Sequence, residues 1–123
     1  MLAWSTRKMA KWVEEALKDA PSGMVAVLGD AALGKAVAAT GRKVVGSVAP
    51  DSALAAVVSV SPAASAEAYE GWSQAVVDGG VVVVIERAAR EEASCRALSA
   101  ALSELSQRVS GKRVMTSGRV RRF

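Results

Sequence analysis

Three short apolar runs constrain the fold of this 123-residue chain most strongly, and they cover residues 24–28, 53–60 and 81–86. The last run reads VVVVIE, and its β-branched side chains favour a strand. Apolar runs of this length are typical of strands that are buried on both faces of a sheet. Because a parallel sheet needs connections that cover its faces, we expect helices between these strands.

The segments around the three runs carry helical patterns. In residues 5–20, Met9, Val13 and Leu17 recur at helical spacing, with charged residues outside that stripe. Asp30 stands where it can cap a following helix, and we interpret it as a cap rather than a catalytic acid. Further helices are expected over residues 31–40, 63–77 and 88–109.

Two further strand regions complete the expected sheet. Residues 43–48 are strand-like, and the C-terminal residues 113–116 and 119–123 flank Ser117-Gly118, which predicts a hairpin turn. The length fits one domain, with an N-terminal helix over about 5–20 and a core over about 24–123.

Composition argues against several classes of site and location. The sequence has no histidine, so we expect no metal site and no histidine base. Cys95 is the only cysteine, which rules out an internal disulfide and favours a reducing compartment. No apolar run approaches the roughly 20 residues of a membrane helix, and the charged N-terminus does not read as a signal peptide. We therefore expect a cytoplasmic protein.

The order of motifs resembles the S-adenosylmethionine-dependent methyltransferases of the Rossmann-like class. The loop GDAALG follows the first strand, and DSALAAVVSV and DGGVVVVIE match the family's fourth and fifth strands. The resemblance implies a three-layer α/β sandwich with a mostly parallel sheet and a C-terminal antiparallel hairpin at one edge. It also implies a cofactor site in which Gly29, Asp30 and Gly34 would hold S-adenosylmethionine.

Two departures from the family concern the residues that would touch this cofactor. Ala31 and Ala32 carry methyl groups in a loop where the family has closely spaced glycines that let the backbone approach the ligand. Residues 46–49 lack the acidic side chain that the family places at the end of its second strand to bind the ribose hydroxyls.

A third departure concerns the connection after the second strand. Only five residues separate Val48 from Leu54, whereas a parallel crossover needs about a dozen. Either the family's third strand is missing, or the second strand ends near Val45 and residues 46–53 form a tight crossover. From the three departures we predict a non-catalytic scaffold or protein-interaction module, without a cofactor, that binds a protein partner or forms a homodimer.

Other interpretations stay open. The chain could be a minimal S-adenosylmethionine-binding methyltransferase. Gly29, Gly34 and Lys35 also match part of a phosphate-binding loop, although Ala36 replaces the hydroxyl residue that holds Mg²⁺. No acidic residue follows Arg108, so the C-terminal edge could serve a nucleic-acid accessory protein, or simply be a solvated edge strand. The basic residues of that edge are Arg113, Arg119, Arg121 and Arg122.

Two polar residues are candidates for a site at the carboxyl edge of the sheet, where ligands gather in open α/β folds. Glu86 ends the strongest predicted strand, and Ser61 follows the run over residues 53–60. No residue is assigned a catalytic role.

Overall fold

The computed structural model of the chain describes residues 6–49, 51–60, 66–87, 102–110 and 113–121. The elements in chain order are α1 (Thr6–Ala16), β1 (Val25–Leu28), α2 (Ala31–Ala38), β2 (Val44–Val45), β3 (Leu54–Val60), α3 (Ala66–Ala75), β4 (Val76–Arg87), β5 (Leu102–Ser110) and β6 (Arg113–Val120).

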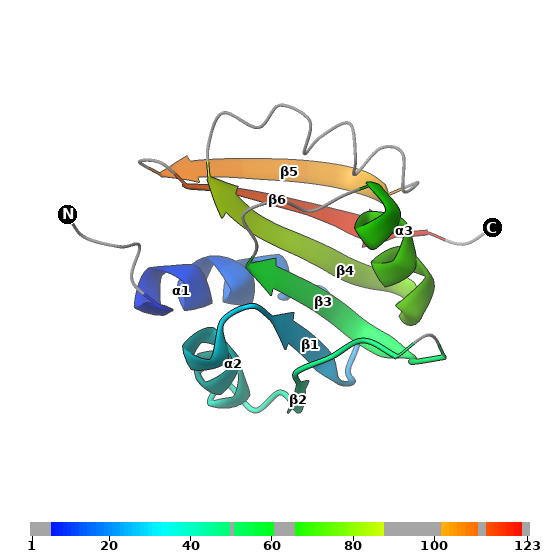
Figure 1. The fold of residues 1–123 in the computed structure, drawn as a ribbon, viewed down its shortest axis with the longest axis horizontal. Helices are drawn as coiled ribbons and strands as arrows, with labels where there is room; N and C mark the ends of the chain where they lie inside the picture. Colours follow the sequence, from blue (N-terminus) through cyan, green and yellow to red (C-terminus); the bar gives the residue numbers. More distant parts are fainter. Residues whose placement is uncertain (1–5, 50, 61–65, 88–101, 111–112, 122–123) are drawn as a thin grey trace.

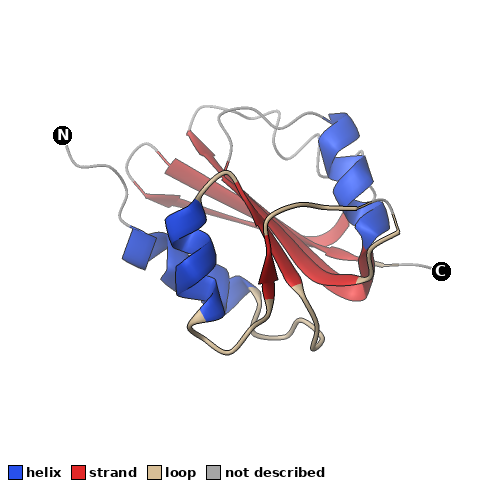
Figure 2. Cartoon of the chain, turned by 60° about the horizontal axis from the view of Figure 1, so that its bottom comes forward, coloured by secondary structure: helices blue, strands red, loops and turns tan. Residues whose placement is uncertain are grey.

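One six-stranded sheet organises the molecule, with the strand order β2-β1-β3-β4-β6-β5 (Figure 1). The first four strands in this order run parallel, and β6 is antiparallel to both β4 and β5. Figure 2 shows the sheet as the middle layer, with α1 and α2 on one side and α3 on the other. The expected three-layer α/β sandwich, with an antiparallel hairpin at one edge, is therefore confirmed.

Alternate side chains of the strands fill two cores, one on each face of the sheet. On the first face, Met9, Val13 and Leu17 of the N-terminal helical region pack with Leu33 and Val37 of α2 against the strands. The apolar stripe predicted for α1 is thus the surface that the helix buries. Burial of such side chains, at about 25 cal/mol per Å² of apolar surface, is the main source of stability for this layer.

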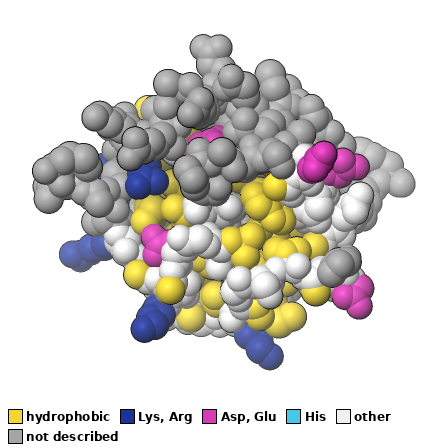
Figure 3. Space-filling model, in the orientation of Figure 1, with side chains coloured by type: hydrophobic (Ala, Val, Ile, Leu, Met, Phe, Trp, Pro, Cys, Tyr) yellow, Lys and Arg dark blue, Asp and Glu magenta, His cyan; other side chains and the backbone are white. Residues whose placement is uncertain are grey.

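The second core lies between the sheet and α3, with Tyr69 and Ala75 of α3 against valines of β3 and β4. Figure 3 shows hydrophobic side chains gathered near the centre of this face. The partly buried side chains packed against this core are Met24, Leu28, Val45, Val48, Trp72 and Leu105.

The connection after β2 resolves the crossover question. β2 ends at Val45, the chain passes β1 to reach β3 at Leu54, and the described residues of this connection, 46–49 and 51–53, contain no helix. Hydrogen bonds between Ala49 and Ser52 form a turn within this connection, and Val48 packs against the second core. The alternative in which the strand ends near Val45 is therefore the one observed, and the strand predicted over 43–48 is shorter than expected.

The structure corrects the predicted boundary between α3 and the following strand. The helix expected over residues 63–77 ends at Ala75, and β4 begins at Val76 rather than at Val81. The predicted turn at Asp78-Gly79-Gly80 is an irregularity within β4, where the register against β3 shifts. Gly79 adopts a φ of 82°, which glycine tolerates without strain.

The C-terminal region differs most from the prediction. The helix expected over 88–109 is wrong from residue 102 onward, because Leu102–Ser110 forms β5; residues 88–101 lie outside the described part. The predicted turn at Ser117-Gly118 is also wrong, since both residues lie inside the continuous strand β6. The antiparallel hairpin exists, but it joins β5 to β6.

Candidate functional site

The turn from β1 into α2 stands at the carboxyl edge of the parallel strands. Gly29 adopts a φ of 84°, and a Cβ atom there would lie 2.1 Å from the carbonyl oxygen of Val60 at the end of β3. The glycine is therefore required by the close approach of β3. Next to it, Ala31 and Ala32 are exposed, so their methyl groups do not fill the interior of the loop.

Asp30 is the N-cap of α2, as predicted. Its Oδ1 atom accepts a hydrogen bond of 2.9 Å from the backbone N–H of Leu33, and its carbonyl oxygen accepts one of 3.1 Å from Gly34. The cap fixes the direction of α2, whose positive N-terminal end lies beside the ends of β1 and β3.

A shallow pocket opens between α2 and β2, with a volume of about 310 Å³. This volume lies at the small end of the range for small-molecule sites. Asp30 supplies the carboxylate of this pocket, and the position directly after β2 is Gly46, which offers no side chain. Its lining residues are Val27, Asp30, Ala31, Gly34, Lys35, Ala38, Val44, Val45 and Gly46.

Gly34 and Lys35 lie within α2 and not in an open loop. A phosphate-binding loop needs both of its glycines to bracket exposed backbone, so this arrangement does not form one. A Cβ atom on Gly34 would meet Val27 and Val44 at 3.8 Å, which is ordinary van der Waals contact. Gly34 is therefore not needed for close packing of helix and sheet.

Glu86 lies on the opposite face of the sheet from Asp30. Its side chain is fully buried, at 0% exposure, near the end of β4. The pleat of the sheet places Glu86 on the α3 face together with Ser59 and Thr116, which both pair with Val84 and are also buried. Since β3 separates β4 from β1, the two strands are roughly 10 Å apart, and Glu86 does not join the pocket beside Gly46.

Gln107 of β5 contacts this set of buried polar side chains through Thr116. Its Nε2 atom donates a hydrogen bond of 2.9 Å to Oγ1 of Thr116. Sequence reasoning missed this contact because it expected residue 107 in a helix. The burial of Glu86 and Ser59 also had no signal in the sequence, where both read as polar residues near strand ends.

The basic C-terminal residues are partly engaged by an acidic side chain. Oε2 of Glu104 lies 3.1 Å from Nε of Arg119 and 2.7 Å from an amino nitrogen of Arg121. The Arg119 side chain is 21% exposed and also donates to the carbonyl oxygens of Asp19 and Gly79, at 3.3 and 3.1 Å. Arg113 is half-buried at the start of β6.

Two predicted site residues, Ser61 and Arg122, lie outside the described residues. Within the residues that the structure describes, no group of three or more acidic or cysteine side chains could hold a metal ion. No helix in that same part of the chain is long and apolar enough to span a bilayer.

No protein-family model and no curated protein matches the sequence. Solved structures match the fold, and one is a possible exported protein from Bordetella parapertussis, with a TM-score of 0.68, 12% identity and coverage of 96% of this chain and 69% of the other. Another is an O-methyltransferase family protein from Burkholderia thailandensis, with a TM-score of 0.63, 13% identity, and coverage of 94% and 56%.

A third match is a 16S rRNA N2 G1207 methyltransferase from Thermus thermophilus, solved with AdoMet and guanosine. Its TM-score is 0.53 at 15% identity, over 83% of this chain and 36% of that one. This chain thus spans about half or less of the two methyltransferases named here. At these identities the comparisons define a fold, which is the methyltransferase-like Rossmann fold.

The comparisons also correct one sequence-based prediction. We expected no cofactor, but the solved structures that match this fold include an S-adenosylmethionine-dependent methyltransferase and a methyltransferase that holds AdoMet itself. One of the three departures behind that expectation was steric crowding by Ala31 and Ala32, and both of these side chains are exposed at the surface.

Proposed function

We propose that the chain binds S-adenosylmethionine at the carboxyl edge of its sheet, in the pocket between α2 and β2. The observation that carries the proposal is the turn at Gly29, which places the first residues of α2 at the surface beside the open end of β2. The methyltransferase-like fold supports the same location, because open α/β sheets bind ligands at this edge.

The residues in the pocket suit the cofactor in part. The start of α2 offers backbone N–H groups and a positive dipole to the carboxylate of the methionine portion. Gly46, where a Cβ atom would meet no atom within 4 Å, leaves room beside the end of β2. The bound cofactor would supply an electrophilic methyl group, and the chain's residues would position it.

The lack of a carboxylate at Gly46 makes this site weaker than one with a ribose-binding acid. The nearest acidic residue along the chain is Asp51, which is exposed in the connection to β3. We therefore expect binding that is saturable but modest in affinity. At a hundredfold excess over the Kd, the cofactor would stabilise the fold by about 2.7 kcal/mol.

Isothermal titration with S-adenosylmethionine and S-adenosylhomocysteine tests the proposal directly. Ala31→Trp, at an exposed lining position, should block the pocket without disturbing the core. Gly46→Asp should tighten binding roughly tenfold, because a charge-assisted hydrogen bond contributes about 1.5–3 kcal/mol. Ala39→Asp adds the same charge at the exposed end of α2 and serves as the control. If neither compound gives saturable heat, or Ala31→Trp leaves it unchanged, the proposal fails.

A second candidate function is protein interaction through the outer strand β5. The Val109 side chain on this strand is 67% exposed, the largest exposure among the described large hydrophobic residues. Sedimentation equilibrium of the wild type and of Val109→Ser tests this candidate. Self-association that weakens in the variant supports it, and a monomer at all concentrations, with no change in the variant, argues against it.

A further inference from the structure

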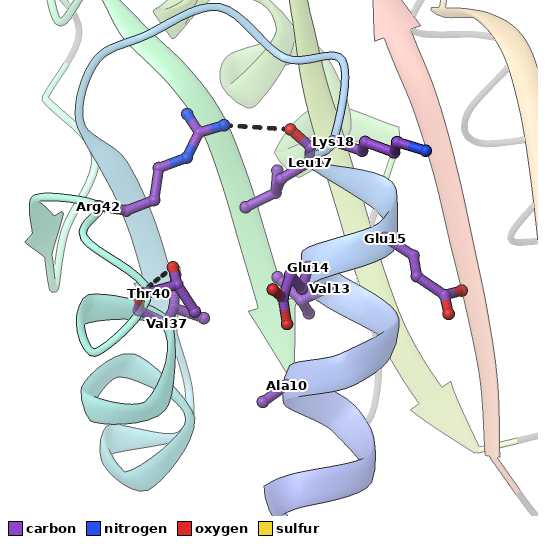
Figure 4. Close-up of a pocket in the computed structure, with 9 residues that line it drawn as sticks. All are labelled: Ala10, Val13, Glu14, Glu15, Leu17, Lys18, Val37, Thr40 and Arg42. Atoms are coloured by element: carbon purple, nitrogen blue, oxygen red, sulfur yellow. Dashed lines mark hydrogen bonds between the residues drawn. The ribbon is translucent and has the colours of Figure 1, made fainter.

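A second pocket lies between α1 and α2, with a volume of about 470 Å³ (Figure 4). It is bordered by the second half of α1, the last turn of α2 and Arg42 ahead of β2. These segments precede β1 and β2, so the pocket stands toward the amino ends of the strands, away from the candidate cofactor site. Its lining residues are Ala10, Val13, Glu14, Glu15, Leu17, Lys18, Val37, Thr40 and Arg42.

The walls of this pocket are mainly apolar. Val13 and Leu17 from the N-terminal helical region and Val37 from α2 are buried core residues, and Ala10 leaves space at one end. A volume of this size, with apolar walls and a few polar groups, is typical of a small-molecule site.

Arg42 closes one end of the pocket as a fixed bridge. Its guanidinium donates to the carbonyl oxygen of Leu17 at 3.1 Å and to that of Pro21 at 2.9 Å. Figure 4 shows the bond to Leu17 crossing the top of the pocket. Because Arg42 binds the carbonyl groups that follow α1, its charge is offset by the negative end of that helix.

The remaining charges single out Glu14. Glu15 forms an ion pair with Arg108 of β5, and in Figure 4 the side chains of Glu15 and Lys18 extend to the side of α1 that faces away from α2. The carboxylate of Glu14 extends instead toward α2 and the pocket. The pocket thus combines apolar walls with a negative charge at its rim.

We propose that this pocket binds a small organic cation, an ammonium ion carried on an apolar body such as an aromatic ring. The apolar body would occupy the space between Ala10, Val13 and Val37, and the ammonium group would pair with Glu14. An anionic ligand of the same shape would meet the Glu14 carboxylate and be repelled. The proposal does not depend on S-adenosylmethionine binding, since the two pockets have different lining residues.

Titration with 2-phenylethylammonium, followed by amide chemical shifts in nuclear magnetic resonance spectra, tests this proposal. We expect saturable shifts in the residues that line the pocket and at least tenfold weaker binding of 2-phenylethanol, which lacks the charge. Glu14→Gln should weaken the ammonium probe about tenfold, because it removes the charged partner. Glu67→Gln, at an exposed position on α3, is the matched control and should bind like the wild type.

Two further variants test whether the probe occupies this pocket and not the one beside Gly46. Ala10→Leu fills the cavity and should abolish binding; if that variant does not fold, the comparison of Glu14→Gln with Glu67→Gln decides. Ala31→Trp blocks the other pocket and should leave the probe's affinity unchanged. Absence of saturable shifts, equal binding of the alcohol, or unchanged binding in Glu14→Gln would each overturn the proposal.

Discussion

Gly29 and Val60 approach each other so closely that a Cβ atom on Gly29 would lie 2.1 Å from the carbonyl oxygen of Val60. The contact joins the end of β1 to the end of β3. The atoms nearest to the added Cβ belong to the backbone of Val60, so no flexible side chain can move away to make room for it. Gly29→Ala should therefore destabilise the fold by at least about 2 kcal/mol, through steric overlap and a positive φ.

Gly41→Ala is the natural comparison for Gly29→Ala in urea unfolding. Gly41 also has a positive φ, of 99°, but a Cβ atom there would meet no atom within 4 Å. Gly41→Ala should therefore lose only the free energy needed to hold alanine at a positive φ, about 1–2 kcal/mol. Equal losses in the two variants would contradict the close contact between Gly29 and Val60.

Asp30→Ala should reduce the free energy of unfolding by about 0.5–2 kcal/mol, because the variant loses the cap of α2. Asp30→Asn retains an oxygen that can accept from the Leu33 N–H and should lose much less. Asp51→Ala, at an exposed position in the connection after β2, is the control and should change stability by under about 0.5 kcal/mol. Chemical denaturation of the three variants measures these differences.

Arg42→Ala should loosen the N-terminal helix from the rest of the fold. The variant leaves the carbonyl oxygens of Leu17 and Pro21 without the guanidinium donor, at a cost of about 1.5–3 kcal/mol. Amide hydrogen exchange should accelerate in α1 more than in β3. Lys43→Ala, which removes an exposed charge from the neighbouring position, should leave exchange in α1 unchanged.

Gly118→Ala should destabilise the C-terminal hairpin, because its Cβ atom would lie 2.8 Å from Cδ2 of Leu105 and 2.9 Å from Cβ of Leu102. We expect a cost of about 1–3 kcal/mol from overpacking. Leu105→Ala makes room at one of these contacts, so the double variant should lose less than the sum of the two single losses. Strict additivity would indicate that β5 does not pack over Gly118 as observed.

The central part of the fold could be predicted from sequence because local pattern and tertiary structure agree there. The run at Val81–Glu86 favours a strand at each position, and Asp30 gives a helix start with a defined chemistry. The mostly parallel sheet with an antiparallel hairpin at one edge followed from the resemblance to a known family, whose motifs occur here in sequence order.

The C-terminal region could not be predicted because local pattern and tertiary pairing disagree. Leu102, Leu105 and Val109 recur at helical spacing, yet they lie on a strand whose stability comes from pairing with β6. Glu104, with a φ of 52°, lies between Ser103 and Ser106, where the register against β6 shifts. The shift lets Leu102 and Leu105 pack over Gly118 on one face, an arrangement that depends on contacts distant in sequence.

At the candidate site, too, some features could be predicted from the local sequence, whereas others depend on contacts that are distant in sequence. Gly29 was identified from its place after a strand, but its partner Val60 lies 31 positions later and carries no polar signal. The alanines that suggested crowding are at the surface, because α2 begins at Ala31 and turns their methyl groups outward. The residue types in this loop do not by themselves show in which direction the Ala31 and Ala32 side chains point.

Among the described strands, β2 pairs with β1 alone, so the sheet stops at the pocket beside Gly46. A molecule held there has solvent along one flank and can leave by that side without any rearrangement of the chain. Its dwell time should therefore be brief even where equilibrium occupancy is high. Dialysis would record such a complex, whereas gel filtration would lose it before detection.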